Sequence, residues 1–188
     1  MDEYPTVPAS AEAADWPVLD VETVWENAFF AAGYDAVERP TGDAAEYYWI
    51  EPADSVMVVA LDGDDLVMVE QYRPRARRQT LELPAGGVDE GEDPETAARR
   101  ELREETGYVA DDLDHVETYF PSGWVRYVRH VFVAEDPDPG EQALDDGEFV
   151  DVTTVPAGEA IDRVRGQAGP TDGGALTPLY LARDAGYL

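Results

Sequence analysis

The sequence contains no cysteine and no lysine, and its only histidines are His115 and His130. The lack of cysteine excludes disulfides, thiolate nucleophiles and cysteine-based zinc sites. Two histidines leave little choice of base for a serine–histidine triad. No apolar run approaches the roughly 18 residues of a membrane span, and the acidic first residues do not resemble a signal peptide. We therefore expect a cytoplasmic protein without a membrane partner.

Positive charge is also scarce, because 42 acidic residues accompany only 13 basic ones, all of them arginine, for a net charge of −29. A surface of this sign repels nucleic acid, so we expect no nucleic-acid partner. The acidic residues are spread along the chain, which favours adaptation to molar salt over a single acidic partner-binding face. At such salt the Debye length is about 3 Å and the repulsion is screened. The charge says little about the reaction.

The chain has 188 residues, 44% of them hydrophobic, which is enough for one folded domain with an extension. Apolar stretches that alternate with turn signals predict an α+β fold, an α/β/α sandwich in which helices flank a mixed β-sheet. We expect a flexible acidic leader at 1–15, an N-terminal strand extension at 16–54 and the main domain at 55–188. Strands are expected at 18–25, 29–37, 47–50, 56–61, 66–69, 80–83, 116–120, 128–134 and 149–155, and helices at 94–106, 158–165 and 176–185.

The helix at 94–106 has the clearest boundaries. Asp93 is a good N-cap, and Gly107 suits the left-handed position that follows a helix. Apolar residues at helical spacing predict a stripe that faces the core. The residues expected in this stripe are Ala98, Leu102 and Val109.

Three acidic residues, Glu101, Glu104 and Glu105, lie together on one face of this helix. Like charges at this spacing repel one another unless a cation lies among them. Carboxylates without cysteine or histidine favour a hard cation such as Mg²⁺ or Mn²⁺. Arg100 is placed to bind a carboxylate such as Glu92 and so to orient the set. Taken alone, the cluster fits a solvated acidic helix face equally well.

The spacing of these residues is more specific than the cluster. Five residues separate Gly86 from Glu92, and seven more lead to the run Arg100-Glu101-Leu102-Arg103-Glu104-Glu105-Thr106-Gly107-Tyr108. This pattern resembles the Nudix box, G-x5-E-x7-R-E-U-x-E-E-x-G-U, in which U is a bulky aliphatic residue. The one departure is Tyr108 in the last U position, which serves packing and leaves the acidic residues unaffected.

The resemblance implies a Nudix hydrolase, an α/β/α sandwich enzyme that uses a divalent metal to hydrolyse a nucleoside diphosphate linked to another group. It further implies that Glu101, Glu104 and Glu105 hold Mg²⁺ (or Mn²⁺), with the backbone carbonyl of Ala85 as an additional ligand. The glycine that matches Gly86 lets the chain turn close to the metal. Such metals neutralise the diphosphate and lower the pKa of an attacking water.

Similarity extends beyond the box to ADP-ribose pyrophosphatases, which cut ADP-ribose to AMP and ribose 5-phosphate. Residues 69–73, 81–87 and 147–152 carry it, together with the N-terminal strand extension. The resemblance implies a nucleoside diphosphate sugar as substrate, with ADP-ribose as the first candidate. The alternatives are another nucleoside diphosphate sugar or a dinucleoside polyphosphate, and a non-catalytic protein that binds such a ligand. Proteins of this last kind typically lose box glutamates, which are all present here.

Arginines are concentrated between residues 73 and 78, which suits the binding of a diphosphate in an otherwise acidic chain. In the family, the arginine that matches Arg73 contacts the substrate. The others, Arg75, Arg77 and Arg78, also fit a solvated loop. Arg126 is expected to contact another phosphate of the substrate, although an arginine there is unusual in the family and leaves the terminal group of the substrate open.

A glutamate from the loop before the last strand acts as the catalytic base in related enzymes, and Glu148 matches it. Glu141 or Asp146 are the possible substitutes, and Glu104 is the competitor within the helix. An aromatic residue near the N-terminus stacks on adenine in the family, often across a dimer interface. We take Tyr47 as the first candidate, with sheet packing as the alternative. Related enzymes exchange their N-terminal strands between subunits, so the resemblance also implies a homodimer.

Overall fold

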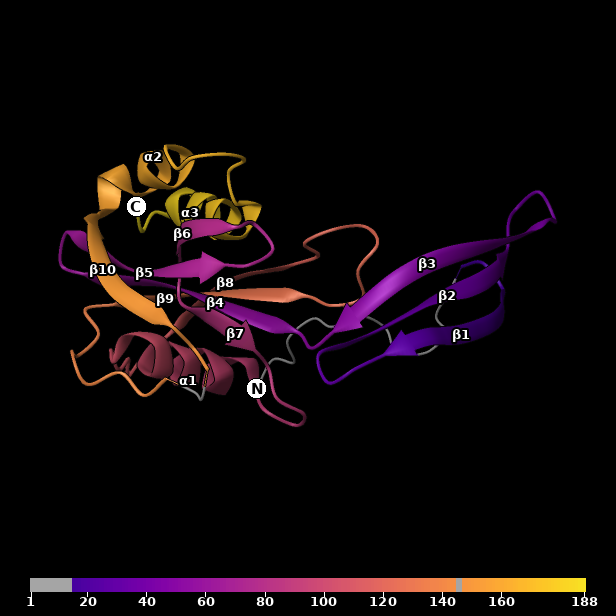
Figure 1. Ribbon diagram of the computed structural model, residues 1–188, viewed down its shortest axis with the longest axis horizontal. Coiled ribbons are helices and arrows are strands. Elements are labelled where there is room, and N and C mark those ends of the chain that lie inside the picture. The colour runs from indigo at the N-terminus through magenta and orange to yellow at the C-terminus, as the bar shows by residue number, and fades with distance from the viewer. Residues whose placement is uncertain (1–14, 145–146) are drawn as a thin grey trace. The chain divides into compact units, whose positions relative to one another are not determined.

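The computed structural model describes residues 15–144 and 147–188, which form two compact units (Figure 1). The first unit contains the described residues up to Asp54 together with Thr118–Arg129, and the second contains Ser55–Glu117 and His130–Leu188. The expected leader lies outside the described residues except for Asp15. No helix of the described chain is long and apolar enough to cross a membrane.

The first unit is built on a three-stranded antiparallel sheet in the order β1-β2-β3. Its register places Gly33 of the central strand opposite Trp49. A Cβ on Gly33 would lie 2.7 Å from the Trp49 ring, so the glycine leaves room for the indole, which is buried. The strands are β1 (Val18–Glu26), β2 (Phe30–Glu38) and β3 (Ala44–Pro52).

The second unit is built on a seven-stranded sheet in the order β10-β5-β4-β9-β8, with β6 paired to β5 and β7 paired to β4. The end of β8 and the first residue of β9 are assigned to the first unit. The hairpin of β4 and β5 turns at Gly63, whose φ of 59° suits glycine. Consecutive apolar residues of these two strands, 56–61 and 66–69, are buried and form the centre of the core. The strands are β4 (Ser55–Asp62), β5 (Asp65–Arg73), β6 (Arg78–Glu82), β7 (Ala85–Gly87), β8 (Asp114–Tyr119), β9 (Arg129–Glu135) and β10 (Val150–Pro156).

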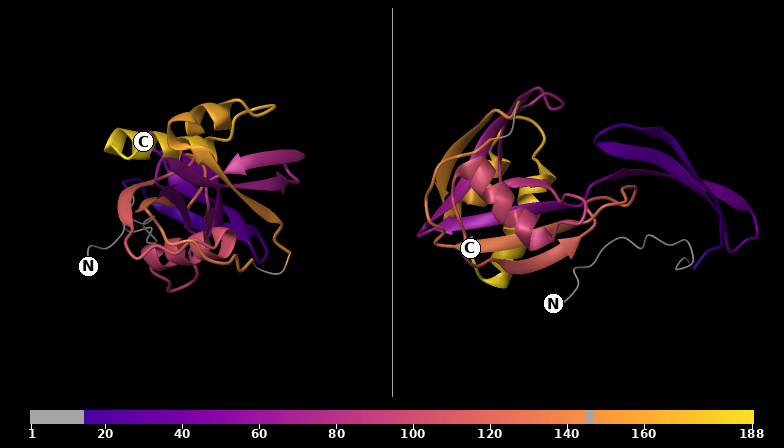
Figure 2. Two further views of the ribbon diagram at one scale, coloured as in Figure 1. Left: turned by 90° about the vertical axis from the view of Figure 1, so that its left-hand side faces the viewer. Right: turned by 90° about the horizontal axis from the view of Figure 1, so that it is seen from below.

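Helices cover both faces of this sheet, with α1 (Pro94–Thr106) on one side and α2 (Ala160–Arg165) and α3 (Gly173–Ala185) on the other (Figure 1 and Figure 2). This arrangement confirms the predicted α+β fold, an α/β/α sandwich with a mixed sheet and an N-terminal strand extension. Every strand predicted from the sequence is present. The short strand β7 was not predicted, because a Pro84 and two glycines argue locally against a strand.

The boundaries of α1 confirm the predicted caps. The Asp93 side chain accepts hydrogen bonds from the backbone N–H groups of Glu95 and Thr96, and Gly107 adopts a φ of 81°. Ala98 and Leu102 are fully buried, as predicted. Val109 is 44% exposed, so its assignment to the core stripe was wrong. The helix has already ended before it, and the helical spacing no longer applies.

The C-terminal helices differ slightly from the prediction. The first begins with a short 3-10 turn, Ala157–Glu159, before α2. The second, α3, begins at Gly173 rather than at residue 176, because Asp172 provides an N-cap that accepts a hydrogen bond from the Gly174 N–H. Both helices lie against β6.

Candidate active site

Two of the predicted metal ligands, Glu101 and Glu105, lie on the buried side of α1 and are only 9% and 5% exposed. Glu105 Oε2 accepts a hydrogen bond of 2.8 Å from the backbone N–H of Ala85 in β7. The carboxylate of Glu101 lies against Gly86, where an added Cβ would be 2.0 Å from Oε1. The helix and β7 therefore meet at these two carboxylates, and only glycine fits at position 86.

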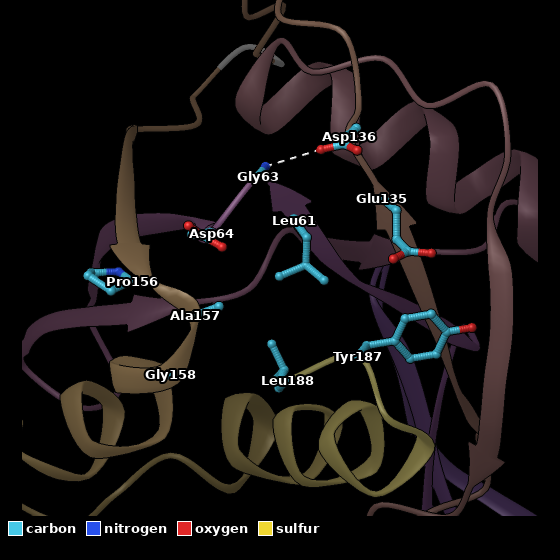
Figure 3. A pocket seen from close by; sticks show the side chains of 10 residues that line it. All are labelled: Leu61, Gly63, Asp64, Glu135, Asp136, Pro156, Ala157, Gly158, Tyr187 and Leu188. Carbon is cyan, nitrogen blue, oxygen red and sulfur yellow. Dashed lines mark hydrogen bonds between the residues drawn. The ribbon is translucent and has the colours of Figure 1, made fainter.

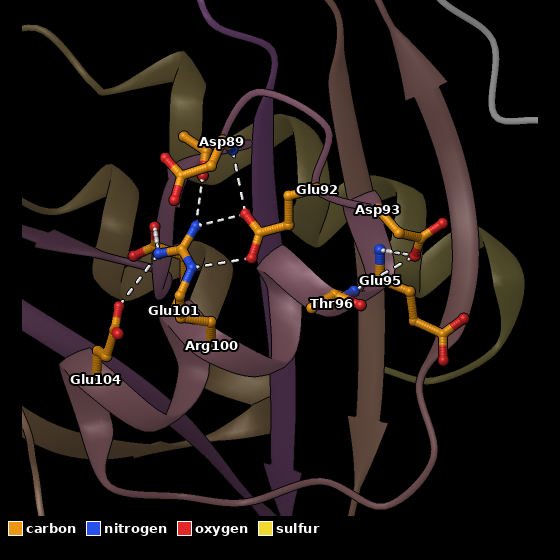
Figure 4. A network of polar contacts seen from close by, with 9 residues as sticks. Asp89, Glu92, Asp93, Glu95, Thr96, Arg100, Glu101 and Glu104 are labelled. Atoms are coloured by element: carbon orange, nitrogen blue, oxygen red, sulfur yellow. Dashed lines mark hydrogen bonds and ion pairs between the residues drawn. The ribbon is translucent and has the colours of Figure 1, made fainter.

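Arg100 connects three acidic residues of the site, Glu92, Glu101 and Glu104 (Figure 4). Its guanidinium donates to both carboxylate oxygens of Glu92, with Nε–Oε1 of 3.0 Å and Nη2–Oε2 of 2.9 Å. Nη1 also donates to Glu101 Oε1 at 2.6 Å and to Glu104 Oε2 at 3.2 Å. A further bond joins Nη2 to the carbonyl of Gly87. The predicted pairing of Arg100 with Glu92 is confirmed, and Glu104 joins the same network.

The electrostatics of the two buried carboxylates are unusual. The pKa of Glu105 is raised to about 8, chiefly by burial and also by the charges of Glu101 and Glu148, against the opposing hydrogen bond from the Ala85 N–H. Burial also raises the pKa of Glu101, opposed by its bond to Arg100. The pKa of Glu92, in contrast, is lowered by its hydrogen bonds to Arg100. Raised pKa values in neighbouring buried acids are typical of functional sites that accept positive charge.

Glu148 lies close enough to this cluster for its charge to raise the pKa of both Glu101 and Glu105. Asp146, one of its predicted substitutes, falls outside the described residues, and Glu141 is exposed. Within residues 15–144 and 147–188, no three acidic or histidine side chains already form a ready-made metal site. Arg100 instead bonds to both Glu101 and Glu104.

Arg73, the predicted substrate-binding arginine, ends β5 and forms an ion pair with Glu82 of β6. Arg73 Nε donates to Glu82 Oε1 at 2.8 Å, and Nη2 bonds to Oε2. Burial raises the pKa of Glu82, but the hydrogen bonds from Arg73 and Thr80 outweigh it and the net shift is downward. Sequence reasoning missed Glu82. Its signal is an acidic residue between the two apolar residues Leu81 and Leu83.

The two remaining predicted substrate residues, Tyr47 and Arg126, belong to the first unit. Tyr47 is 48% exposed and meets the ring of Trp16 edge to face, with centroids 6.2 Å apart. The Arg126 guanidinium lies 4.4 Å from the centroid of the Trp49 ring and forms an ion pair with Asp35. Its side chain is thus already engaged within the first unit, while its predicted substrate contact stays a prediction.

A cavity of about 650 Å³ lies at the other end of the β4–β5 hairpin from Arg73 (Figure 3). Its lining includes the carboxylates of Asp64, Glu135 and Asp136, and none of the described residues that line it is basic. Figure 3 shows these acidic side chains around one rim of the cavity. The glutamate cluster at α1 and β7 is accompanied by arginines, because Arg100 bonds to Glu101 and the charge of Arg73 acts on Glu105. The cluster is therefore the better candidate for phosphate chemistry.

An α/β/α sandwich in which buried glutamates of a capped helix meet the glycine-containing strand β7 is typical of hydrolases that act on phosphates. The family model described as the NUDIX domain matches residues 51–173. The chain belongs to this family and is a Nudix hydrolase.

Several known proteins are similar to this chain. The ADP-ribose pyrophosphatase of Bacillus subtilis is 38% identical over 132 residues, which cover 68% of this chain and 71% of the relative. The methanol dehydrogenase activator of Bacillus methanolicus is 32% identical over 151 residues, covering 78% and 82%. A crystal structure of an ADP compounds hydrolase matches in fold with a TM-score of 0.80 and 24% identity, covering 93% of this chain and 98% of that one.

Proposed function

We propose that this Nudix hydrolase cleaves the pyrophosphate bond of a nucleoside diphosphate sugar in a metal-dependent reaction, with ADP-ribose as the first candidate substrate and AMP and ribose 5-phosphate as products. The observation that carries the proposal is the pair of buried carboxylates, Glu101 and Glu105, with raised pKa values beside Gly86. Support for the substrate comes from the similarity to the ADP-ribose pyrophosphatase of Bacillus subtilis.

The residues present fit a divalent cation. Burial and neighbouring negative charges push these two carboxylates toward the neutral form, and a cation between them favours the charged form again. Oxygen donors without sulfur or imidazole favour Mg²⁺ (or Mn²⁺). We assign Glu101, Glu104 and Glu105 and the backbone carbonyl of Ala85 as the ligands. When bound, the ion neutralises diphosphate charge and lowers the pKa of a water molecule.

The protein's own residues then carry the remaining steps. We assign Glu148 as the base that accepts the proton of the attacking water, with Glu104 or Glu141 as the alternatives. Arg100 holds Glu101 and Glu104 in place and acts as a positioning residue for both. Arg73 binds phosphate oxygens at the end of β5, because a guanidinium matches them with two parallel hydrogen bonds. Gly86 keeps the approach to the carboxylates free of side-chain atoms.

Two further assignments concern the first unit. Tyr47 offers an exposed ring for stacking on the base, and Arg126 offers a cation to a second phosphate. The large apolar side chains exposed on β1 and in the turn that precedes β2 support a homodimer formed through the N-terminal strands. They are Leu19, Val21, Val24, Trp25 and Phe29. The acidic composition supports a cytoplasm of high salt as the place of action.

A panel of nucleotides in the presence of MgCl₂ tests the proposed reaction, with products identified by chromatography. The panel contains ADP-ribose, other nucleoside diphosphate sugars and a dinucleoside polyphosphate. We expect the highest kcat/KM for ADP-ribose, with AMP as the product and no turnover after chelation of metal. A preference for another nucleoside diphosphate derivative would support the alternative Nudix specificity. Ligand binding without turnover of any member would indicate a non-catalytic binding protein and contradict the proposal.

A further inference from the structure

The edge strand β6 (Arg78–Glu82) has a strand partner on one side only. It pairs with β5 in a register that sets Thr80 opposite Gln71 and Leu81 opposite Glu70. No other strand of the described chain pairs with β6. An edge of this kind leaves backbone N–H and C=O groups without a ladder partner unless something else satisfies them.

The side chain of Gln167 satisfies both outward-facing groups of Leu81. The Leu81 N–H donates to Gln167 Oε1 at 2.8 Å, and Gln167 Nε2 donates to the Leu81 carbonyl at 3.3 Å. Nε2 also donates to the carbonyl of Val164 at 3.2 Å, which fixes the amide to the end of α2. The amide therefore replaces a neighbouring strand at one position, across a sequence separation of 86 residues.

A second tie joins the same segment to the start of β6. Arg78 Nη2 bonds to the carbonyl of Pro170, and an added Cβ on Gly169 would lie 2.8 Å from Arg78 Nη1. The loop between α2 and α3 thus holds β6 at two points, Arg78 and Leu81. We call residues 167–170 the β6 clamp.

The residue next to Leu81 is Glu82, which forms an ion pair with Arg73. Glu82 is 6% exposed and bonds to Arg73 through both carboxylate oxygens, while Thr80 Oγ1 donates to its Oε1 at 2.6 Å. The position of the Arg73 guanidinium therefore depends on the position of β6. The position of β6 depends in turn on the clamp.

We propose that Gln167 is a positioning residue for Arg73, acting through Leu81 and Glu82, and that it thereby sets the affinity for the diphosphate substrate. This inference rests on the proposed substrate role of Arg73. Loss of the amide frees the edge of β6, loosens Glu82 and lets the guanidinium of Arg73 leave its paired geometry. A positioned guanidinium binds more tightly than a mobile one, because less side-chain freedom is lost on binding.

Exchange of the Arg73 Nε proton with water, followed by NMR in the full-length protein without substrate, tests the clamp directly. We expect Gln167→Ala to speed this exchange several-fold, since the bond from Nε to Glu82 opens more often. Gln167→Glu keeps the acceptor for the Leu81 N–H but loses the donor, so we expect an intermediate rate. Gln79→Ala is the matched control, because Gln79 is an exposed residue of the same strand. An unchanged rate in Gln167→Ala, with the Leu81 amide newly exchanging, would overturn the proposal.

Steady-state kinetics then separate the clamp from the function of Arg73. We expect Gln167→Ala to raise KM for the substrate about three- to tenfold with little change in kcat, a range that corresponds to one weakened hydrogen-bonded contact. In an Arg73→Gln background the same substitution should leave KM unchanged, because the arginine is already absent. Equal KM effects in both backgrounds would overturn the proposal. If Arg73→Gln alone leaves KM unchanged, the substrate role of Arg73 fails, and the exchange experiment still decides the clamp.

Discussion

The carboxylate of Glu101 occupies the space in which a side chain at Gly86 would begin, since an added Cβ would lie 2.0 Å from its Oε1. The backbone of β7 therefore approaches the helix more closely than any other residue type allows. This contact links the glycine of the Nudix box to one of its glutamates within the fold, 15 residues apart in the sequence.

Gly86→Ala is expected to displace Glu101 and to lower kcat by about two orders of magnitude, because small misplacements of catalytic groups carry costs of this size. Gly158→Ala is the control, since no atom lies within 4 Å of its added Cβ and its φ is not positive. Circular dichroism should show both variants folded. Wild-type kcat in the Gly86 variant would show that the close approach has no role in the reaction.

The raised pKa of Glu105 predicts how the stability of the metal-free protein depends on pH. Its folded-state pKa of about 8 lies above the ordinary value of 4.5, so the folded state binds more protons between these values. Stability should be highest below pH 4.5 with respect to this group and fall as pH rises toward 8. Glu105→Gln removes the penalty, and we expect its melting temperature at pH 8 to exceed that of the wild type by several degrees.

The measurement compares melting temperatures of the two proteins at pH 5 and pH 8 in the presence of a chelator. The gain from Glu105→Gln should be larger at pH 8 than at pH 5. Glu95→Gln provides the control on the same helix, because Glu95 lies at the surface and pairs with Arg99. A gain of equal size at both pH values would contradict the raised pKa.

The acidic composition predicts that folding requires salt. At 0.01 M ionic strength the Debye length is about 30 Å, so the acidic side chains that give the net charge of −29 repel one another with little screening. This repulsion destabilises the folded state. We also expect MgCl₂ to raise the melting temperature more than NaCl at matched ionic strength, because Mg²⁺ binds the glutamate cluster in the folded state only. In the double variant of Glu101→Gln and Glu105→Gln the two salts should act alike. Equal effects of both salts on the wild type would show that the helix binds no specific ion.

The exposed apolar side chains of the first unit predict self-association. Phe29 is 83% exposed and Val24 is 63% exposed. Light scattering in high salt should give the mass of a dimer, and the pair of substitutions Val24→Asp and Phe29→Asp should shift it to the monomer. Asp substitutions at Val109 and Phe149, exposed residues of the second unit, serve as the control. A monomer mass for the wild type would reject the dimer.

The parts of the site that the sequence predicted are those that local chemistry determines. The sequence predicts helix α1 from its cap residues, Asp93 and Gly107, and from the helical spacing of Ala98 and Leu102. The helical geometry then places Glu101 and Glu105 on the same face. The same local reasoning failed at Val109, which lies beyond the cap. A helical spacing predicts burial only for residues within the helix, and α1 ends at Thr106.

The parts that the sequence did not predict depend on contacts between distant segments. Glu82 meets Arg73 only because β5 and β6 pair in one particular register, and Gln167 meets Leu81 only because α2 packs against the sheet edge. Gln167 lies in no motif, and Glu82 lies in a segment of family resemblance, residues 81–87, without a predicted role of its own. Their roles follow from burial and hydrogen bonding, which a single sequence does not reveal.

The turnover of variants at the glutamate pair tests the central claim most directly. At saturating MgCl₂, Glu101→Gln and Glu105→Gln each keep the size of the side chain but remove its charge, and we expect kcat for ADP-ribose to fall about a thousandfold. Glu95→Gln should turn over at the wild-type rate. A kcat near that of the wild type in either glutamate variant would contradict the account, because the buried carboxylates would then play no part in the reaction.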